Sequence, residues 1–311
     1  MIIKAPIDLE LTQNSGQTSQ PPWKLDNNIY SDVVVADNKA VLFQVKQKEN
    51  NLDFNFIGDI SNKEATKKIK TIFDLDFNLN KFYKYLNNQP ELADMTNFCR
   101  DLRLFLAKDK FECVISSVCS ANNSIVRWTK SIDDIKKSWG NKYTYSEKDY
   151  FTFPDVSDFK NIYCDDVEEF ECCSNLNNPG ECINNLKSCG VGYRAPYMKK
   201  ASEIFTLEMD LDDISKMSYD EAFDTMLKVP GVGPKVADCI LLYGFNFRQA
   251  FPTDVWIKRI VSYLYFDGKN INVSKIREFG MEEFGDYAGY VQLYLFHYAR
   301  MSGLMKKLKG M

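Results

Sequence analysis

The sequence that decides the fold reads Leu-Lys-Val-Pro-Gly-Val-Gly-Pro-Lys-Val-Ala-Asp-Cys over residues 227–239 and Phe-Pro-Thr-Asp-Val-Trp over residues 251–256. An amphipathic segment, 219–228, precedes it and predicts a helix. Gly231 and Gly233 flank one apolar residue and permit a tight turn. Pro234 fits the first position of a second helix, which we expect to end near Gly244. The stretch therefore predicts two helices joined by a glycine-rich hairpin.

Lys235 and Asp254 indicate that this hairpin has a catalytic role in addition to binding a ligand. Bare amides at the start of a helix bind phosphate, and the positive helix end favours the neutral, nucleophilic form of Lys235. Cys239 shares its face four residues on, and Asp254 begins a further expected helix over 255–266. A nucleophilic Lys near a carboxylate is equipped for Schiff-base chemistry at a sugar C1′. Taken singly, the same features also fit a binding-only hairpin, a surface lysine and a helix N-cap.

Together these residues resemble the signature of the helix-hairpin-helix DNA glycosylases, and within them most closely the 8-oxoguanine DNA glycosylases. The resemblance implies that Lys235 attacks C1′ and cleaves the strand by β-elimination through a Schiff base. Asp254 would stabilise the positive charge that builds on the sugar. Gly231 and Gly233 would contact DNA, and Trp256 stands where the family usually has a phosphate-binding His. No cofactor is required, but a monovalent cation would be held by the backbone carbonyls of Leu227, Val229 and Val232.

Two distant segments complete the base pocket that the resemblance implies. From composition alone, the small polar residues over 14–19 predict a hairpin turn, and the aromatic-rich C-terminal segment predicts a core helix. By resemblance, Gly16 presents its carbonyl to the N7 hydrogen that only oxidised guanine carries. Phe296 would stack on one face of the base and Cys239 would cover the other. Gln292 shares a helix face with Phe296 and would bind the Watson–Crick edge.

Two further motifs match the same family. Asn122 lies in a polar break between two expected helices, where paired Asn residues equally fit a helix cap. Gly-Tyr-Arg-Ala at 192–195, read alone, is a loop before a helix. The resemblance implies that Asn122 fills the gap left by the flipped base and that Tyr193 wedges into the stack. Arg127 and Arg194 would bind the orphaned cytosine.

The remaining pattern predicts an α+β protein. An N-terminal antiparallel sheet domain with helices is expected over 1–106, and a mostly helical glycosylase region over 107–311. Short β-type runs broken by turns predict the strands. We expect them at Ile7-Asp8-Leu9-Glu10-Leu11, 31–37, 40–46 and 52–57.

Composition bears on the binding partner, the cell compartment and the presence of a metal cluster. The formal charge is −4, which argues mildly against nucleic acid, but residues 227–311 hold 12 Lys and Arg against 7 Asp and Glu. Nine cysteines without a secretion signal indicate reduced thiols, so we expect a cytoplasmic protein, at the nucleoid or in a nucleus according to the cell. Five cysteines fall between 161 and 189, without C-x₂-C spacing or a nearby His, which disfavours a metal cluster. They are Cys164, Cys172, Cys173, Cys182 and Cys189.

The expected partner is double-stranded DNA containing 8-oxoguanine opposite cytosine. No membrane association is expected, and the chain should act as a monomer. Two alternatives remain open. A glycosylase for another base, such as an alkylated purine, typically lacks the lysine, and Lys235 argues against it. A non-enzymatic binder of DNA structure would use only the hairpin and would leave Lys235, Cys239 and Phe296 without a shared pocket.

Overall fold

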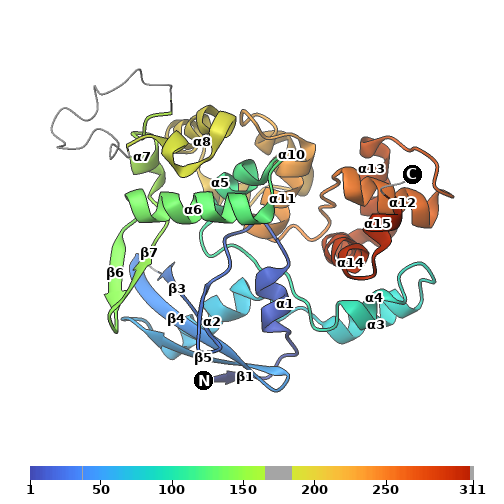
Figure 1. Ribbon diagram of the computed structural model, residues 1–311, viewed down its shortest axis with the longest axis horizontal. Coiled ribbons are helices and arrows are strands. Elements are labelled where there is room, and N and C mark those ends of the chain that lie inside the picture. Colours follow the sequence, from blue (N-terminus) through green and yellow to red (C-terminus); the bar gives the residue numbers. More distant parts are fainter. Residues whose placement is uncertain (37, 165–183, 309–311) are drawn as a thin grey trace.

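The computed structural model describes residues 1–36, 38–164 and 184–308. A five-stranded antiparallel sheet near the N-terminus precedes a mostly helical region (Figure 1), so the predicted α+β class is confirmed. Its strand order is β1-β5-β4-β3-β2. The strands are β1 (Ile2–Ile3), β2 (Lys24–Asp26), β3 (Ile29–Ala36), β4 (Lys39–Lys48) and β5 (Asn51–Ile57). The consecutive strands β3, β4 and β5 form the meander that the sequence predicts.

Helices make up most of the remaining chain. A short hairpin of β6 (Lys142–Tyr145) and β7 (Lys148–Phe151) interrupts them. The first helices are α1 (Leu9–Asn14), α2 (Asn62–Ile72), α3 (Leu79–Asn87), α4 (Met95–Phe98), α5 (Lys110–Ser120), α6 (Ile125–Trp139) and α7 (Val156–Phe159). The later ones are α8 (Ala195–Leu207), α9 (Leu211–Ile214), α10 (Tyr219–Met226), α11 (Pro234–Phe245), α12 (Val255–Tyr265), α13 (Val273–Phe284), α14 (Ala288–Met301) and α15 (Leu304–Leu308). No described helix is both long and apolar enough to cross a bilayer.

The strand predicted at 7–11 is wrong, because this segment begins helix α1. The Asp8 carboxylate accepts a hydrogen bond from the amide of Leu11 at 2.8 Å, as an N-cap does. Leu9, Thr12 and Gln13 are buried, at the three- and four-residue spacing of one helix face. The alternation of apolar and polar residues is therefore too short to fix the conformation.

Two hydrophobic cores hold the molecule together. The sheet packs against α2 through side chains such as Val41, Phe43 and Ile69, all fully buried. A larger core runs through the helices and includes Phe82 of α3 and Met95 of α4. Figure 1 shows α3 and α4 beside α14, away from the sheet, although the expected boundary at 106 groups them with it. That boundary stays a prediction. The hairpin α10–α11 lies between the sheet and the C-terminal helices.

Four buried charges connect the sheet to helices α5 and α6. Asp32 of β3 pairs with Lys108 and, at 3.2 Å, with Lys136 of α6. Glu112 of α5 lies 3.8 Å from Lys108 and 3.9 Å from Lys136. Burial raises the pKa of Asp32, but the two lysines outweigh it and hold that pKa below its ordinary value. Asp32 therefore fixes two cations that would otherwise be costly to bury.

Replacing Asp32 by Asn is expected to lower the free energy of unfolding at pH 7 by about 3–5 kcal/mol, because it leaves buried lysines short of a counter-charge. The folded pKa is depressed, so the contribution is present above the unfolded pKa and is lost as pH falls through the folded value. Urea unfolding at pH 7 and pH 3 measures both effects. Asp59→Asn, which breaks the exposed pair with Lys39, should have a far smaller effect on the free energy of unfolding, because water screens that pair. Equal effects at the two sites would contradict this account.

Candidate active site

The predicted hairpin forms between α10 and α11. Ser218 and Glu221 build a capping box at the start of α10. Gly231 has φ +83°, and a Cβ there would lie 2.6 Å from Cγ of Tyr197, so the position requires glycine and the Tyr197 ring packs directly on the turn. A Cβ on Gly233 would meet no atom within 4 Å. The hairpin is thus fixed on one side by α8 and open at the residue that precedes α11.

Helix α11 begins without a side-chain cap. Gly233 is the N-cap and Pro234 the first residue of the helix. Its first amides are therefore available to an anion that approaches over Gly233. The helix ends at Phe245, one residue beyond the expected Gly244, because Asn246 adopts a left-handed cap conformation.

The predicted catalytic and pocket residues lie around one small cavity of about 70 Å³. They come from four segments that are far apart in sequence: the loop after α1, helix α11, the segment before α12, and helix α14. The lining residues are Ser15, Gly16, Gln17, Thr18, Lys235, Cys239, Tyr243, Pro252, Asp254, Gln292, Leu293 and Phe296. A lysine amine, a carboxylate, a thiol, an amide and an aromatic ring therefore share one cavity.

Asp254 has two tasks. Its Oδ1 accepts hydrogen bonds from the amides of Trp256 at 2.9 Å and Ile257 at 2.8 Å, which makes it the N-cap of α12. In the described part of the chain, Oδ2 has no hydrogen-bond donor. The cap fixes the orientation of the carboxylate and leaves one oxygen for chemistry.

Lys235 and Cys239 lie one turn apart on α11, as predicted. Lys235 is half-buried and Cys239 is buried. Burial raises the pKa of the Cys239 thiol, although Lys235 opposes the shift. A neutral, buried thiol serves as a wall of the cavity rather than as a nucleophile. Lys235 supplies the one amine among the lining residues of the cavity, all of which are described.

Gln292 brings a polar group without a protein partner to the pocket. Its side chain is buried, and Oε1 accepts no hydrogen bond in the described structure. An unsatisfied buried amide is costly unless a ligand completes it. Phe296 lies one turn further along α14 and also lines the cavity, with the Arg300 guanidinium 5.7 Å from its ring centre.

The loop around Gly16 is held firmly. Gly16 has φ +85°, and a Cβ there would lie 2.5 Å from Cδ1 of Ile125. The Gln17 amide donates to the carbonyl of Arg103 at 3.0 Å and accepts from the amide of Phe105 at 2.9 Å. Thr18 shares a hydrogen bond with Ser117 of α5. The loop follows a helix rather than the predicted strand, yet it delivers Gly16 to the cavity.

The motifs expected to contact the orphaned base form a second cluster. Ser124 caps α6, and Asn122 is exposed in a left-handed turn with φ 50°. Arg194 donates from Nε to the carbonyl of Ala121 at 2.8 Å and from Nη2 to that of Asn122 at 2.9 Å. Arg194 is therefore buried and positions Asn122, a contact that its sequence did not indicate. The roles of these residues towards DNA stay predictions.

Tyr193 and Arg127 are exposed beside this turn. Tyr193 is 59% exposed. It lies 4.4 Å, ring centre to guanidinium carbon, from Arg194 in a cation–π contact. Arg127 is in the first turn of α6. Both side chains are therefore exposed on the same surface as Asn122, and their contacts with DNA stay predictions.

A buried hydrogen-bonded network near the site is not indicated by the sequence pattern. Asp238, next to Cys239 on α11, binds Arg277 of α13 through Nε at 2.7 Å and accepts a hydrogen bond from Tyr219 of α10. The network joins both helices of the hairpin to α13. Asp238 is fully buried, which the apolar residues around it in the sequence could have suggested.

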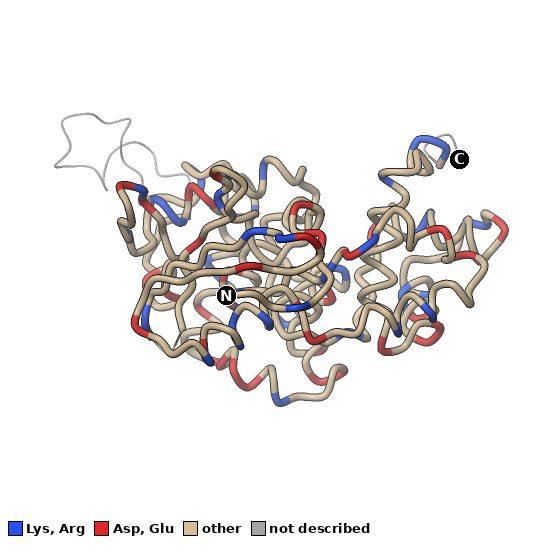
Figure 2. Tube along the Cα trace, turned by 90° about the horizontal axis from the view of Figure 1, so that it is seen from below, with Lys and Arg blue, Asp and Glu red and all other residues tan. Residues whose placement is uncertain are grey.

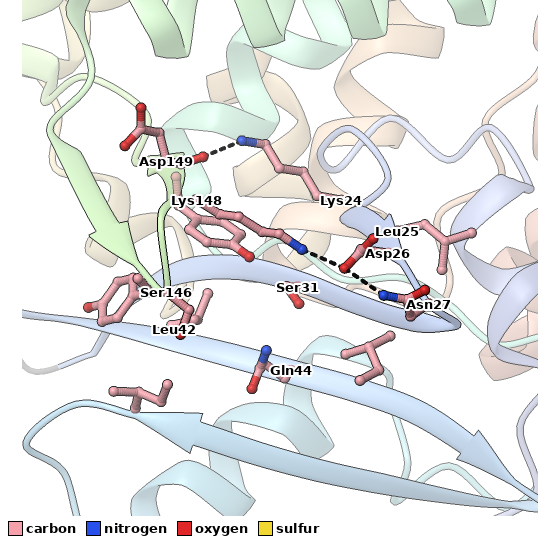
Figure 3. A pocket seen from close by; sticks show the side chains of 14 residues that line it. Lys24, Leu25, Asp26, Asn27, Ser31, Leu42, Gln44, Ser146, Lys148 and Asp149 are labelled. Carbon is pink, nitrogen blue, oxygen red and sulfur yellow. Dashed lines mark hydrogen bonds and ion pairs between the residues drawn. The ribbon is translucent and has the colours of Figure 1, made fainter.

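A wider groove of about 700 Å³ lies between the β6–β7 hairpin and the sheet (Figure 3). Its charges are already paired: Lys148 contacts Asp26 at 2.5 Å, and Lys24 donates to the carbonyl of Asp149 at 2.5 Å. None of the predicted site residues, all of which are described, lines it. Size alone therefore does not locate the active site.

Metal ligands do not gather in the described parts of the chain, where no three His, Cys, Asp or Glu side chains come together. Cys164 and Cys189 are both buried. Cys172, Cys173 and Cys182 lie outside the described residues.

Comparison with known proteins gives the family. Residues 1–114 match the 8-oxoguanine DNA glycosylase N-terminal domain, and residues 115–285 match the HhH-GPD superfamily of base excision DNA repair proteins. A probable N-glycosylase/DNA lyase of Methanothermobacter thermautotrophicus is 44% identical over 97% of this chain and 96% of its own. The N-glycosylase/DNA lyase of Saccharomyces cerevisiae is 26% identical over 95% of this chain and 84% of its own.

Solved structures agree. The Clostridium acetobutylicum 8-oxoguanine glycosylase/lyase, in complex with double-stranded DNA containing cytosine opposite 8-oxoG, has a TM-score of 0.78 at 28% identity, over 97% of this chain and 98% of its own. A 3-methyladenine DNA glycosylase from Archaeoglobus fulgidus has a TM-score of 0.77 at 20% identity, over 97% of this chain and 98% of its own, which shows a shared fold alone. With the matched domains and the 44% identical relative, the chain belongs to the 8-oxoguanine DNA glycosylase/lyase family of the HhH-GPD superfamily and is a base excision repair glycosylase with lyase activity.

Proposed function

We propose that this enzyme excises 8-oxoguanine opposite cytosine in duplex DNA, with Lys235 as the nucleophile. One observation carries the proposal: a single cavity brings Lys235 and Asp254 together with Gly16, Gln292 and Phe296, the residues expected to recognise the base. A hairpin that only bound DNA would not need such a cavity.

The chemistry follows from two groups. The Lys235 amine attacks C1′, the bond from C1′ to the base breaks, and the base leaves with the bonding electrons and takes up a proton. Oδ2 of Asp254 stabilises the positive charge that develops on the sugar. Opening of the sugar ring gives a protonated imine between Lys235 and C1′. Loss of a proton from C2′ then expels the 3′ phosphate by β-elimination.

Base recognition depends on a buried polar atom that has no hydrogen-bond partner in the described protein. The buried Oε1 of Gln292 accepts no bond from the described protein, so a donor on the Watson–Crick edge of the base completes it. Phe296 and the neutral Cys239 thiol give the flat base two apolar faces. The cavity of about 70 Å³ is smaller than the roughly 300 Å³ of small ligand pockets, so the lining side chains separate when the base enters.

We also propose that the hairpin carbonyls hold a monovalent cation. In the described structure, the carbonyls of Leu227 and Val232 accept no backbone hydrogen bond outside the helices, while that of Val229 accepts one from Val232 at 3.0 Å. Free carbonyl oxygens are suitable ligands for a hard cation. These three residues would hold the ion, which would add positive charge where a DNA phosphate meets the start of α11.

Excision from four duplexes tests the substrate. We expect release of 8-oxoguanine opposite cytosine to exceed release opposite adenine by about 10–100-fold, because arginine contacts to a base discriminate by about 1–3 kcal/mol. Normal guanine and 3-methyladenine should remain in place. Single-turnover rates at saturating enzyme measure the difference. Preferred release of 3-methyladenine would instead favour the alkylated-purine alternative, whose fold is similar.

A further inference from the structure

A basic groove lies beside the catalytic cavity and shares no lining residue with it. It has a volume of about 340 Å³ and is bounded by α12, the turn at 268–270 and the end of α15. Lys258 and Arg259 line it from α12, and Lys269 lines it from the turn. Figure 2 shows further Lys and Arg positions beside the C-terminus.

The positive charge of this groove is largely unneutralised. No carboxylate is among its lining residues, all of which are described. Asp267 lies 3.8 Å from Lys269, but both side chains are strongly exposed, so this pair contributes little. Arg259 lies 5.3 Å from the Trp256 ring in a cation–π contact, which leaves its N–H groups for an acceptor.

A buried hydroxyl in the same groove lacks a partner. Ser262 is 5% exposed and lines the groove, yet its Oγ makes no hydrogen bond in the described structure. Lys307 of α15 donates a hydrogen bond to the hydroxyl of Tyr263 at 2.8 Å. Since Tyr263 lines the groove, this bond places a fourth positive charge at its edge. An unpaired hydroxyl among cations is suited to an anion with several acceptor oxygens.

Helix α12 connects the groove to the active site. Asp254, its N-cap, lines the catalytic cavity, and Val255, the next residue, lines the groove and is 60% exposed. From Asp254 to Tyr263 the helix rises about 14 Å, the rise of about four nucleotides. A DNA strand that crosses the start of α11 can therefore continue along this helix.

We propose that this groove binds backbone phosphates of the DNA about four nucleotides from the damaged base. This inference rests on one part of the proposed function, namely that DNA lies across the hairpin, and does not depend on which base is excised. Lys258, Arg259 and Lys269 would bind the DNA backbone independently of its sequence and would take no part in catalysis.

The test compares wild type with the triple variant Lys258→Gln, Arg259→Gln, Lys269→Gln on an undamaged duplex over a range of salt. The slope of log affinity against log salt should become shallower by about 2–3, because each phosphate contact contributes about 0.9. Single-turnover excision at saturating enzyme should be unchanged. A matched control, Lys63→Gln, Lys67→Gln, Lys81→Gln, removes the same charge from the exposed faces of α2 and α3.

A second measurement locates the contact. On a duplex with a central abasic-site analogue, which fixes the register of the bound enzyme, ending the duplex about three base pairs from that site on one side should make the wild-type slope shallower and leave the triple variant unaffected. Equal slopes for the triple variant and the control would overturn the proposal, as would loss of affinity that is independent of salt and duplex length. Because neither duplex contains 8-oxoguanine, failure to excise that base would leave both results intact and would count only against the proposed substrate.

Discussion

Replacing Lys235 by Gln is expected to abolish borohydride trapping of the enzyme on a duplex with 8-oxoguanine opposite cytosine. Borohydride delivers hydride to a protonated imine, so trapping requires the amine that forms it. Strand cleavage should be lost with it, and base release should fall by about 10⁴-fold or more, the scale seen when a nucleophile is removed. Gel analysis of trapped and cleaved strands measures both outcomes.

Lys228→Gln supplies the matched control. Lys228 is exposed on the same hairpin, outside the cavity, and its removal changes the charge equally. This variant should still be trapped. If Lys235→Gln were trapped as well as the wild type, another amine would be the nucleophile. Base release without trapping in the wild type itself would indicate a water-based glycosylase.

Local spacing explains why much of the site could be predicted. Lys235 and Cys239 share a face because helices repeat every 3.6 residues, and Gln292 and Phe296 do so for the same reason. Gly231 and Pro234 predict the turn between α10 and α11, because glycine adopts positive φ readily and proline favours the first position of a helix. Only the resemblance, and not spacing, indicated that Gly16 would join residues more than 200 positions away.

The failures have a tertiary origin. Five alternating residues at 7–11 fit a strand, but Asp8 caps a helix there, and the alternation ends too soon to oppose it. The guanidinium of Arg194 holds the turn at Asn122, a contact that no local pattern indicates, while its contact with the opposite base stays a prediction. The pairing of Asp238 with Arg277 joins elements 39 residues apart, and no local pattern indicates such a bond.

Asp254 both caps α12 and, as we propose, stabilises positive charge on the sugar. We expect Asp254→Asn to keep the cap and to lose most of the excision rate. Asn caps helices about as well as Asp, so the bonds to the amides of Trp256 and Ile257 persist and thermal stability stays near the wild-type value. The negative charge beside the sugar is gone, which should lower the excision rate by about 10²–10³-fold. Single-turnover excision and thermal unfolding measure the two effects separately.

Asp254→Ala completes the comparison. It removes charge and cap together, so it should lose the same rate and, in addition, about 1 kcal/mol of stability. Asp254→Ser restores a cap without a charge and should match Asn in both measurements. If Asn and Ser retained most of the excision rate while Ala lost it, the residue would act by positioning α12 alone. The charge would then have to come from elsewhere in the cavity, where Asp254 is the one carboxylate among the lining residues, all of them described.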